Sequence, residues 1–194
     1  MRNVTGANRG AVMAGRRDAL TAASACILLA EKIAAGDPGH GTVATAGKLS
    51  VFPNSTNVIP EKVTFTVEVR DSDNKKIQDA MEEIIGAFKE ECHKRDVRLS
   101  IREVADNKPI HMKDDMVRFM TELADCSGLD FQVMGSGAVH DASMLAQKVD
   151  VAMIFVPSIG GRSHVREEDT KEVDLAAGGE FLLSVIWHML WRKK

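Results

Sequence analysis

One segment of the sequence constrains the fold more than any other. Between Lys62 and Asp71, apolar and polar side chains alternate without a break. Successive side chains of a β-strand point to opposite faces, so this segment presents one apolar and one polar face. Its apolar face consists of Val63, Phe65, Val67 and Val69. The segment therefore predicts a strand that covers a hydrophobic core on one side.

Two helical patterns lie on either side of this strand in the sequence. Apolar residues recur near the 3.6-residue period between Arg16 and Ala34, and a Gly-Asp-Pro-Gly turn follows at residues 36–39. The second pattern follows a capping residue, Ser72 or Asp73, and extends to about Lys94. Its predicted buried stripe consists of Ile77, Met81, Ile84, Ile85 and Phe88.

Further strand patterns cover residues 4–12, 42–51 and 97–104, which completes the order β-α-β-β-α-β over residues 4–105. This order is that of the ferredoxin-like arrangement, in which two helices cover one face of a four-stranded antiparallel sheet. The expected fold class is therefore α+β. The segment Asn107-Lys108-Pro109 predicts a boundary between domains at residues 1–108 and 109–194.

The predicted second domain has a different pattern. A helix is expected over residues 114–127, a glycine-bearing turn opens another that ends near residue 147, and a final helix covers residues 173–191. The apolar run Val151 to Val156 is typical of a strand buried on both faces of a parallel sheet. A parallel α/β sheet needs more strands than this. Residues 109–194 are therefore expected to be an incomplete α/β segment.

Composition narrows the class of partners and the compartment. A formal net charge of −3 and scattered basic residues argue against nucleic acid. No apolar run is expected to reach the roughly 18 residues that span a membrane, and residues 1–6 lack the apolar core of a signal peptide. The three cysteines, Cys26, Cys92 and Cys126, are expected to be buried free thiols in a reducing compartment. These features predict a cytoplasmic protein.

Two polar patches in the first half are candidates for binding. The loop at residues 52–60 contains two prolines and the asparagines Asn54 and Asn57, whose amides could bind a ligand or only form side-chain turns. Arg70 ends the best strand, where an arginine can hold a carboxylate through two hydrogen bonds. A surface ion pair between Arg70 and the neighbouring Asp71 or Asp73 is the alternative.

Two more patches lie in the second half. In the segment from Ser136 to Asp141, glycine permits close approach of the backbone to a ligand, and His140 beside Asp141 could be an oriented base. Helix capping by Ser136 or Asp141 is the alternative. His164 ends a glycine-rich loop after the apolar run, at the place where α/β enzymes bind ligands. One histidine alone does not make a metal site.

Taken together, three segments resemble a known family. "GTVATAGKLSVFPNSTNVIPEKVTFTVEVRD", "SGAVHDASMLA" and "VAMIFVPSIGGRSH" are similar to the N-carbamoyl-L-amino-acid hydrolases, allantoate amidohydrolases and β-ureidopropionases, within the aminoacylase-like dinuclear zinc peptidases. The resemblance covers nearly the whole chain. It implies a ferredoxin-like lid that forms a homodimer, followed by the C-terminal segment of a catalytic domain.

The resemblance also implies roles for individual residues. His164 matches the last metal ligand of a site for divalent zinc or manganese. Asn57 and Arg70 match contacts to the carboxylate of a small-molecule substrate. The implied reaction is hydrolysis of the ureido C–N bond of N-carbamoyl-L-amino acids or allantoate, and the wording of the motifs lies nearer the former.

The turn before the short helix carries further implied contacts. Gly137 and Ala138 match backbone contacts to substrate, and His140 matches a catalytic histidine near the reacting amide. Val139 replaces a usual glycine. Arg9 stands where the family has a histidine that reaches the substrate of the partner subunit, and its charge could still stabilise an oxyanion.

The family's other metal ligands, its bridging aspartate and its general-base glutamate match no residue of this chain. The chain alone is therefore expected to bind no metal stably and to be inactive. Three interpretations remain open: part of a hydrolase, a non-catalytic dimerisation module, or one subunit of a split enzyme.

Overall fold

The computed structural model describes residues 2–5, 12–36, 41–137 and 140–191. The chain divides into two compact units, Met1–Pro109 and Ile110–Lys194. Arg9 and Ala138, two of the residues singled out in the sequence, lie outside the described residues, as does Val139.

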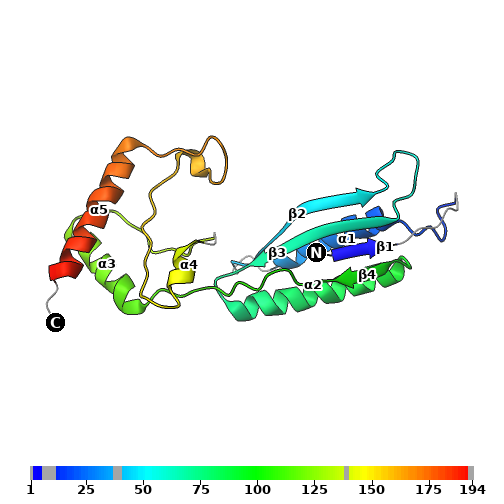
Figure 1. The fold of residues 1–194 in the computed structure, drawn as a ribbon, viewed down its shortest axis with the longest axis horizontal. Helices are drawn as coiled ribbons and strands as arrows, with labels where there is room; N and C mark the ends of the chain where they lie inside the picture. Colours follow the sequence, from blue (N-terminus) through cyan, green and yellow to red (C-terminus); the bar gives the residue numbers. More distant parts are fainter. Residues whose placement is uncertain (1, 6–11, 37–40, 138–139, 192–194) are drawn as a thin grey trace. The chain divides into compact units, whose positions relative to one another are not determined.

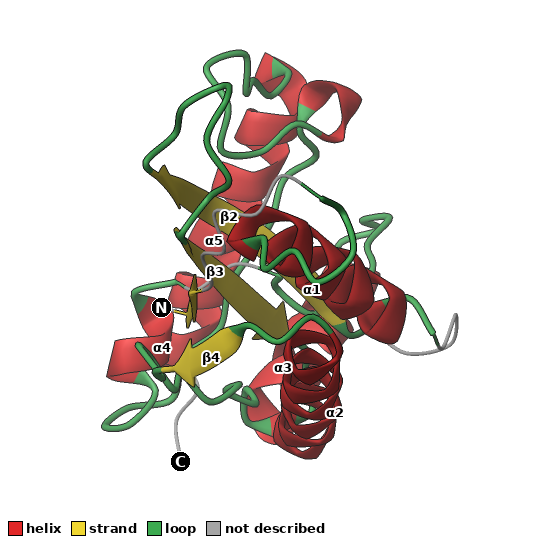
Figure 2. Ribbon diagram, turned by 90° about the vertical axis from the view of Figure 1, so that its right-hand side faces the viewer, coloured by secondary structure: helices red, strands yellow, loops and turns green. Residues whose placement is uncertain are grey.

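The first unit is an antiparallel sheet covered by two helices. Its elements follow the order β1 (Arg2–Thr5), α1 (Ala19–Ala34), β2 (Val43–Phe52), β3 (Lys62–Arg70), α2 (Asn74–Lys94) and β4 (Arg98–Ile101). The strands lie in the order β2-β3-β1-β4, and each neighbouring pair is antiparallel. Helices α1 and α2 contact one another and lie on the same face of the sheet (Figures 1 and 2). The predicted α+β class is confirmed.

Strand β3 is an inner strand of the sheet and covers the core on one side, as its alternation predicts. Val63 and Phe65 are fully buried, whereas Glu68 and Arg70 are exposed. Phe65 packs against Phe88 of α2 with ring centroids 5.8 Å apart, close to the preferred separation for tilted aromatic pairs. The alternating pattern therefore places the apolar face of β3 on the helices.

Helix α1 packs through its smallest side chains. Its buried residues are small: Ala19, Ala22, Ala23, Cys26 and Ala30. The larger Leu28 is 63% exposed. Small side chains let the helix approach the sheet and α2 closely, so the face with the most alanine becomes the packed one.

Both helices of the first unit begin at an aspartate. The Asp18 carboxylate accepts hydrogen bonds from the backbone N–H groups of Leu20 and Thr21, at 2.9 and 3.1 Å. The Asp73 carboxylate accepts one from Lys75 N–H at 2.8 Å. These bonds satisfy N–H groups that have no partner within the helix, and they settle the predicted cap of α2 on Asp73.

The second unit consists of helices joined by long irregular segments: α3 (Asp114–Cys126), α4 (Ala142–Leu145), a 3-10 turn at Ile159–Gly161, and α5 (Glu172–Trp191). The strand expected at residues 151–156 is wrong, because no strand is present among the described residues of this unit. A strand requires a neighbour for its backbone hydrogen bonds, and these residues have none. The helix expected to extend to residue 147 also ends earlier, at Leu145.

Helix α5 is the most apolar exposed element of the chain. Its length and composition would permit it to cross a membrane, so the expectation that no segment reaches this threshold is wrong. Val185 is its one buried residue, whereas Trp187 and Trp191 are largely exposed. Such helices also occur in the cores of soluble proteins, where other elements cover them. Within the second unit, α5 contacts α3.

Candidate active site

Asn57 lies in the loop that joins β2 to β3. The loop is closed at its base by a hydrogen bond from Glu61 N–H to the Phe52 carbonyl, at 2.9 Å. The exposed Asn57 side chain accepts a hydrogen bond from the Ser55 hydroxyl at 3.1 Å. This bond is of the local kind that the side-chain-turn alternative predicts. It uses the amide oxygen, and the amide NH2 remains the group with which Asn57 could donate to an anion.

Arg70 is the last residue of β3, with its side chain 44% exposed. Its Nε donates to the Glu68 carboxylate at 2.9 Å, two residues earlier on the same face of the strand. The expected surface ion pair is therefore made with Glu68. Asp71, the neighbour that was expected to pair, accepts a hydrogen bond from the backbone N–H of Asp73 at 2.8 Å and one from the Thr42 hydroxyl.

Asn57 and Arg70 lie toward opposite ends of β3. The loop that contains Asn57 precedes Lys62, and Arg70 ends the strand eight residues later. Eight residues of β-strand span about 26 Å. In Figure 1 the loop lies beyond one end of the sheet, and β3 runs away from it. One small carboxylate cannot contact both side chains of the same chain.

His140 precedes helix α4 in the second unit. Its Nδ1 accepts a hydrogen bond from Ala142 N–H at 3.1 Å. The histidine therefore occupies the capping role that was expected for Ser136 or Asp141, since Asp141 makes no capping hydrogen bond to the helix. With Nδ1 accepting, a neutral ring carries its proton on Nε2. Gly137 lies nearby in sequence, on the exposed segment before the turn.

His164 lies in a loop shaped by positive backbone φ angles. Gly160, Gly161 and His164 have φ of 69°, 66° and 59°. The His164 N–H donates to the Glu168 carboxylate at 2.8 Å, and Ile159 N–H donates to the Asp169 carbonyl at the same distance. Left-handed backbone conformations are uncommon for residues other than glycine, although histidine adopts them more readily than most. The loop is thus held from several points, with the imidazole at its exposed surface.

This chain is similar to known proteins over most of its length. A model of peptidase family M20/M25/M40 matches residues 5–188. The chain is 37% identical to the allantoate amidohydrolase of Escherichia coli over 158 residues, which are 81% of this chain and 38% of that protein. It is 33% identical to an N-carbamoyl-L-amino-acid amidohydrolase of Paenarthrobacter aurescens, over 88% of this chain and 41% of that protein.

Solved structures give the same result. The chain matches a hydantoinase/carbamoylase-family amidase from Burkholderia vietnamiensis with a TM-score of 0.86 and 30% identity, over 95% of this chain and 45% of that one. The chain belongs to peptidase family M20/M25/M40. It spans less than half the length of these M20 relatives. The resemblance inferred from the motifs is confirmed.

M20 amidohydrolases generally depend on metal ions. Among residues 2–5, 12–36, 41–137 and 140–191, no three His, Cys, Asp or Glu side chains converge on a metal-sized site. His164 matches a metal ligand by resemblance, but zinc in proteins needs about three protein ligands, and a site for two metals needs more. The described donor set therefore does not fit the dinuclear site of the family.

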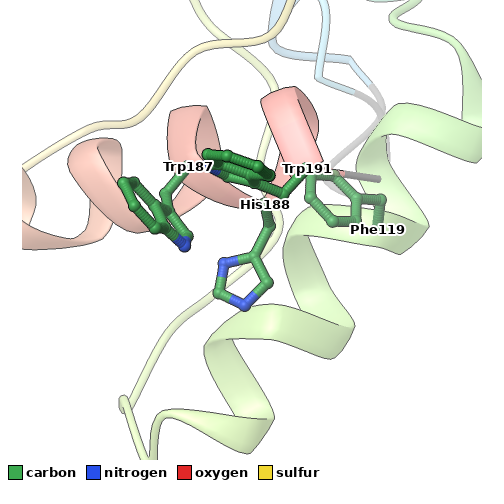
Figure 3. Close-up of a pocket in the computed structure, with 4 residues that line it drawn as sticks. All are labelled: Phe119, Trp187, His188 and Trp191. Carbon is green, nitrogen blue, oxygen red and sulfur yellow. The ribbon is translucent and has the colours of Figure 1, made fainter. Parts of the chain in front are cut away.

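A hollow of this M20 chain lies elsewhere, between α3 and α5. Phe119, Trp187, His188 and Trp191 line a space of about 320 Å³ (Figure 3). The two indole rings have centroids 5.5 Å apart, and His188 Nδ1 lies 2.8 Å from the Ser184 carbonyl oxygen. The sequence signal for this hollow is the pair of tryptophans four residues apart, which places both on one face of the helix. None of the site residues inferred from the family motifs lines it.

Proposed function

We propose that this chain forms the lid and the C-terminal catalytic segment of an M20 amidohydrolase. The proposed reaction is hydrolysis of the ureido C–N bond of N-carbamoyl-L-amino acids or allantoate. The observation that carries the proposal is the match to hydantoinase/carbamoylase amidases over 95% of this chain, because it includes both units. The strand order β2-β3-β1-β4 with two helices on one face supports a ferredoxin-like lid.

The proposed substrate carboxylate is bound by Arg70. A guanidinium presents two parallel N–H groups that match the two oxygens of a carboxylate. The Arg70 Nε donates to the Glu68 carboxylate at 2.9 Å, and both side chains are about half exposed. Exchange of one exposed carboxylate for another has a small electrostatic cost, because exposed ion pairs contribute little. Glu68 thus occupies the Arg70 guanidinium in the absence of substrate, and the substrate carboxylate is proposed to replace it.

Asn57 is proposed to serve a different site from Arg70 of the same chain. The length of β3 separates the two positions by more than a small substrate can bridge. In a two-fold dimer, each residue on one protomer meets its complement on the other, so one site can take both roles from two chains. Each proposed carboxylate site then contains Arg70 of one subunit and Asn57 of its partner. This arrangement makes the proposed homodimer a requirement for binding.

The proposed catalytic roles in the second unit fall to His140 and His164. With Nδ1 accepting from Ala142, His140 offers a protonated Nε2 that can donate to a substrate oxygen. His164 is proposed as a metal ligand, and Gly137 and Ala138 as backbone contacts. Arg9, in place of the family's histidine, is proposed to stabilise an oxyanion. These roles rest on the family motifs.

We further propose that the described residues need additional donors before a metal can be held. His164 is the one ligand that the motifs assign in this chain. The exposed apolar surface of α5 supports completion by further polypeptide, within one chain or as a second subunit of a split enzyme. An isolated dimerisation module would gain nothing from leaving such a surface uncovered.

Carboxylate binding across two chains is tested by mixing variants. Asn57→Ala and Arg70→Ala chains are each expected to lose binding of N-carbamoyl-L-amino acids in calorimetric titration. A refolded equimolar mixture is expected to regain about one quarter of the sites, because each mixed dimer has one intact pair. Arg70→Lys is the matched control for charge without the two-pronged geometry. No recovery in a mixture shown to contain mixed dimers would contradict the shared site.

Turnover is tested on the purified chain with zinc or manganese. N-carbamoyl-L-amino acids and allantoate are supplied, and free amino acid and ammonia are measured. We expect no turnover by this chain alone. Turnover that disappears in His164→Ala would show that the chain holds a complete catalytic centre, and the proposed need for further donors would be wrong.

A further inference from the structure

Two cysteines meet inside the first unit. Cys26 of α1 and Cys92 of α2 are separated by 66 residues in sequence, and their sulfur atoms lie 4.0 Å apart. Both side chains are essentially buried, at 0% and 2% exposure. Cys126, expected to be buried as well, is instead exposed in the second unit. The pair therefore joins the two helices that cover the sheet, and neither cysteine is among the residues assigned to the substrate.

The two thiols interact with each other directly. The hydrogen bond with Cys92, followed by burial, raises the pKa of the Cys26 thiol. The same hydrogen bond lowers the pKa of Cys92. The contact between the two sulfurs thus favours loss of the proton from Cys92 over loss of the proton from Cys26. Thiolate character, together with access, makes a cysteine the target of oxidants.

We propose that Cys26 and Cys92 are a redox modification site, at which a peroxide converts them to a reversible disulfide joining α1 to α2. Cys92 loses its proton and its sulfur attacks one peroxide oxygen, the O–O bond breaks, and the leaving hydroxide takes up that proton, which gives a sulfenic acid and water. Cys26 then loses its proton and attacks the Cys92 sulfur, and the oxygen leaves as a second water. In total, two thiols are oxidised to one disulfide, and hydrogen peroxide is reduced to two waters.

The geometry suits this step. A disulfide bond is about 2 Å long, so the sulfurs must approach by about 2 Å. Rotation of both side chains and a small shift between α1 and α2 supply that movement. Peroxide is small enough to enter when the helix pair opens locally. A glutathione adduct would not fit between two packed helices, which favours the internal disulfide as the product.

The cross-link would stabilise the first unit. It closes a loop of 66 residues that includes β2, β3 and most of α2. Loops of this length give large reductions in the entropy of the unfolded chain when cross-linked. The expected result is a rise in melting temperature of about 5 °C or more, reversed by a reducing agent.

The test uses the full chain with Cys126→Ser, which removes the exposed thiol. After treatment with hydrogen peroxide, the protein is denatured and treated with iodoacetamide, and its intact mass is measured. We expect the mass of the chain less two hydrogens, with no alkylation, and a peptide that links Cys26 to Cys92. The untreated protein takes up two alkyl groups. Dithiothreitol after peroxide restores both alkylation sites and the original melting temperature.

Two further variants separate the disulfide from general oxidation. Cys26→Ser and Cys92→Ser, each combined with Cys126→Ser, leave one internal thiol and show no rise in melting temperature after peroxide. Two alkylated internal thiols after peroxide treatment, or sulfinic acid in place of the cross-link, would overturn the proposal. This measurement needs only the Cys126→Ser protein, so it holds even where a core variant fails to fold.

Discussion

The two units of this chain differ in how completely they bury their own apolar surface. In the first unit, β3, α1 and α2 surround a common core that includes Val63, Phe65, Ile84 and Phe88. Among the described residues of the second unit, only Ala124 and Val185 are buried hydrophobics. Since burial of apolar surface is the main favourable contribution to folding, we expect the first unit to be the more stable of the two.

The similarity to known proteins, in contrast, extends over both units. The family model matches residues 5–188, which includes both units. Sequence similarity therefore reflects common descent along the whole chain, whereas burial reflects which surfaces find their partners within it. Sequence similarity alone therefore does not tell how much of the apolar surface of a unit is buried.

The difference in stability between the two units is tested most directly by expressing each unit alone. Residues 1–109, expressed alone, are expected to unfold in one cooperative transition, because their core is internal. Residues 110–194 alone are expected to show helical circular dichroism without cooperative unfolding. The measurement is thermal and urea denaturation of each piece. Cooperative unfolding of residues 110–194 would show that the second unit has a core of its own.

Two aromatic substitutions, one in each unit, test the same difference in burial within the full chain. Phe65→Ala removes a fully buried ring that packs on Phe88 and is expected to cost about 3–5 kcal/mol of unfolding free energy. Trp187→Ala removes a ring that is 58% exposed and is expected to cost less than about 1 kcal/mol. Urea denaturation measures both. Equal losses would mean that α5 is packed in solution.

Two adjacent glycines in α5 test the packing that the second unit does have. A methyl group at Gly178 would lie 2.5 Å from Cγ1 of Val156, whereas one at Gly179 would meet nothing within 4 Å. Gly178→Ala is expected to destabilise the unit by about 1–3 kcal/mol through this overlap. Gly179→Ala is expected to stabilise the helix by up to about 1 kcal/mol. Helical signal against temperature distinguishes them, and two stabilised variants would contradict the contact.

The smallest expected effect concerns the polar edge of the first unit. Desolvation raises the pKa of Asp71, but hydrogen bonds from the Thr42 hydroxyl and Asp73 N–H bring it below the usual value of 3.8. A lowered pKa in the folded state adds stability above the unfolded value, and that stability is lost as pH falls through the folded pKa. Asp71→Asn is therefore expected to be less stable than the natural protein at pH 7, with the difference shrinking below about pH 4. Urea denaturation across this range measures it, and a constant difference would contradict the shift.

The fold of the first unit is predictable because its signals are local. The alternation in residues 62–71 identifies β3 within one residue, and the capping position at Asp73 marks the start of α2. The strand expected at residues 151–156 fails for a non-local reason. Apolar sequence favours a buried strand, but a strand forms only where another supplies hydrogen bonds. The apolar pattern fits a strand that lies beside other strands, and the part of this unit that the structure describes contains no other strand.

The candidate site likewise combines features that local sequence predicts with features that depend on the fold. Motifs identify Arg70 and His164 as single residues, and resemblance supplies their roles. The predicted strand over residues 62–71 already separates Asn57 from Arg70, whereas the resemblance implies that both contact one carboxylate. The meeting of Cys26 and Cys92 is hidden, since nothing in residue spacing tells which two helix faces pack together.

The number of residues in β3 sets the distance between the β2–β3 loop and Arg70. An insertion of one residue before Arg70 would turn its side chain to the face that Val69 now occupies, toward the helices. An insertion of two would preserve the face but carry the guanidinium about 7 Å further from the β2–β3 loop. Only insertions or deletions of an even number of residues therefore keep Arg70 on its present face, and each pair of residues shifts the arginine by about 7 Å. Any evolutionary adjustment of the distance from loop to arginine must pass through such steps, while substitutions at Glu68 alter the charge beside Arg70 without moving it.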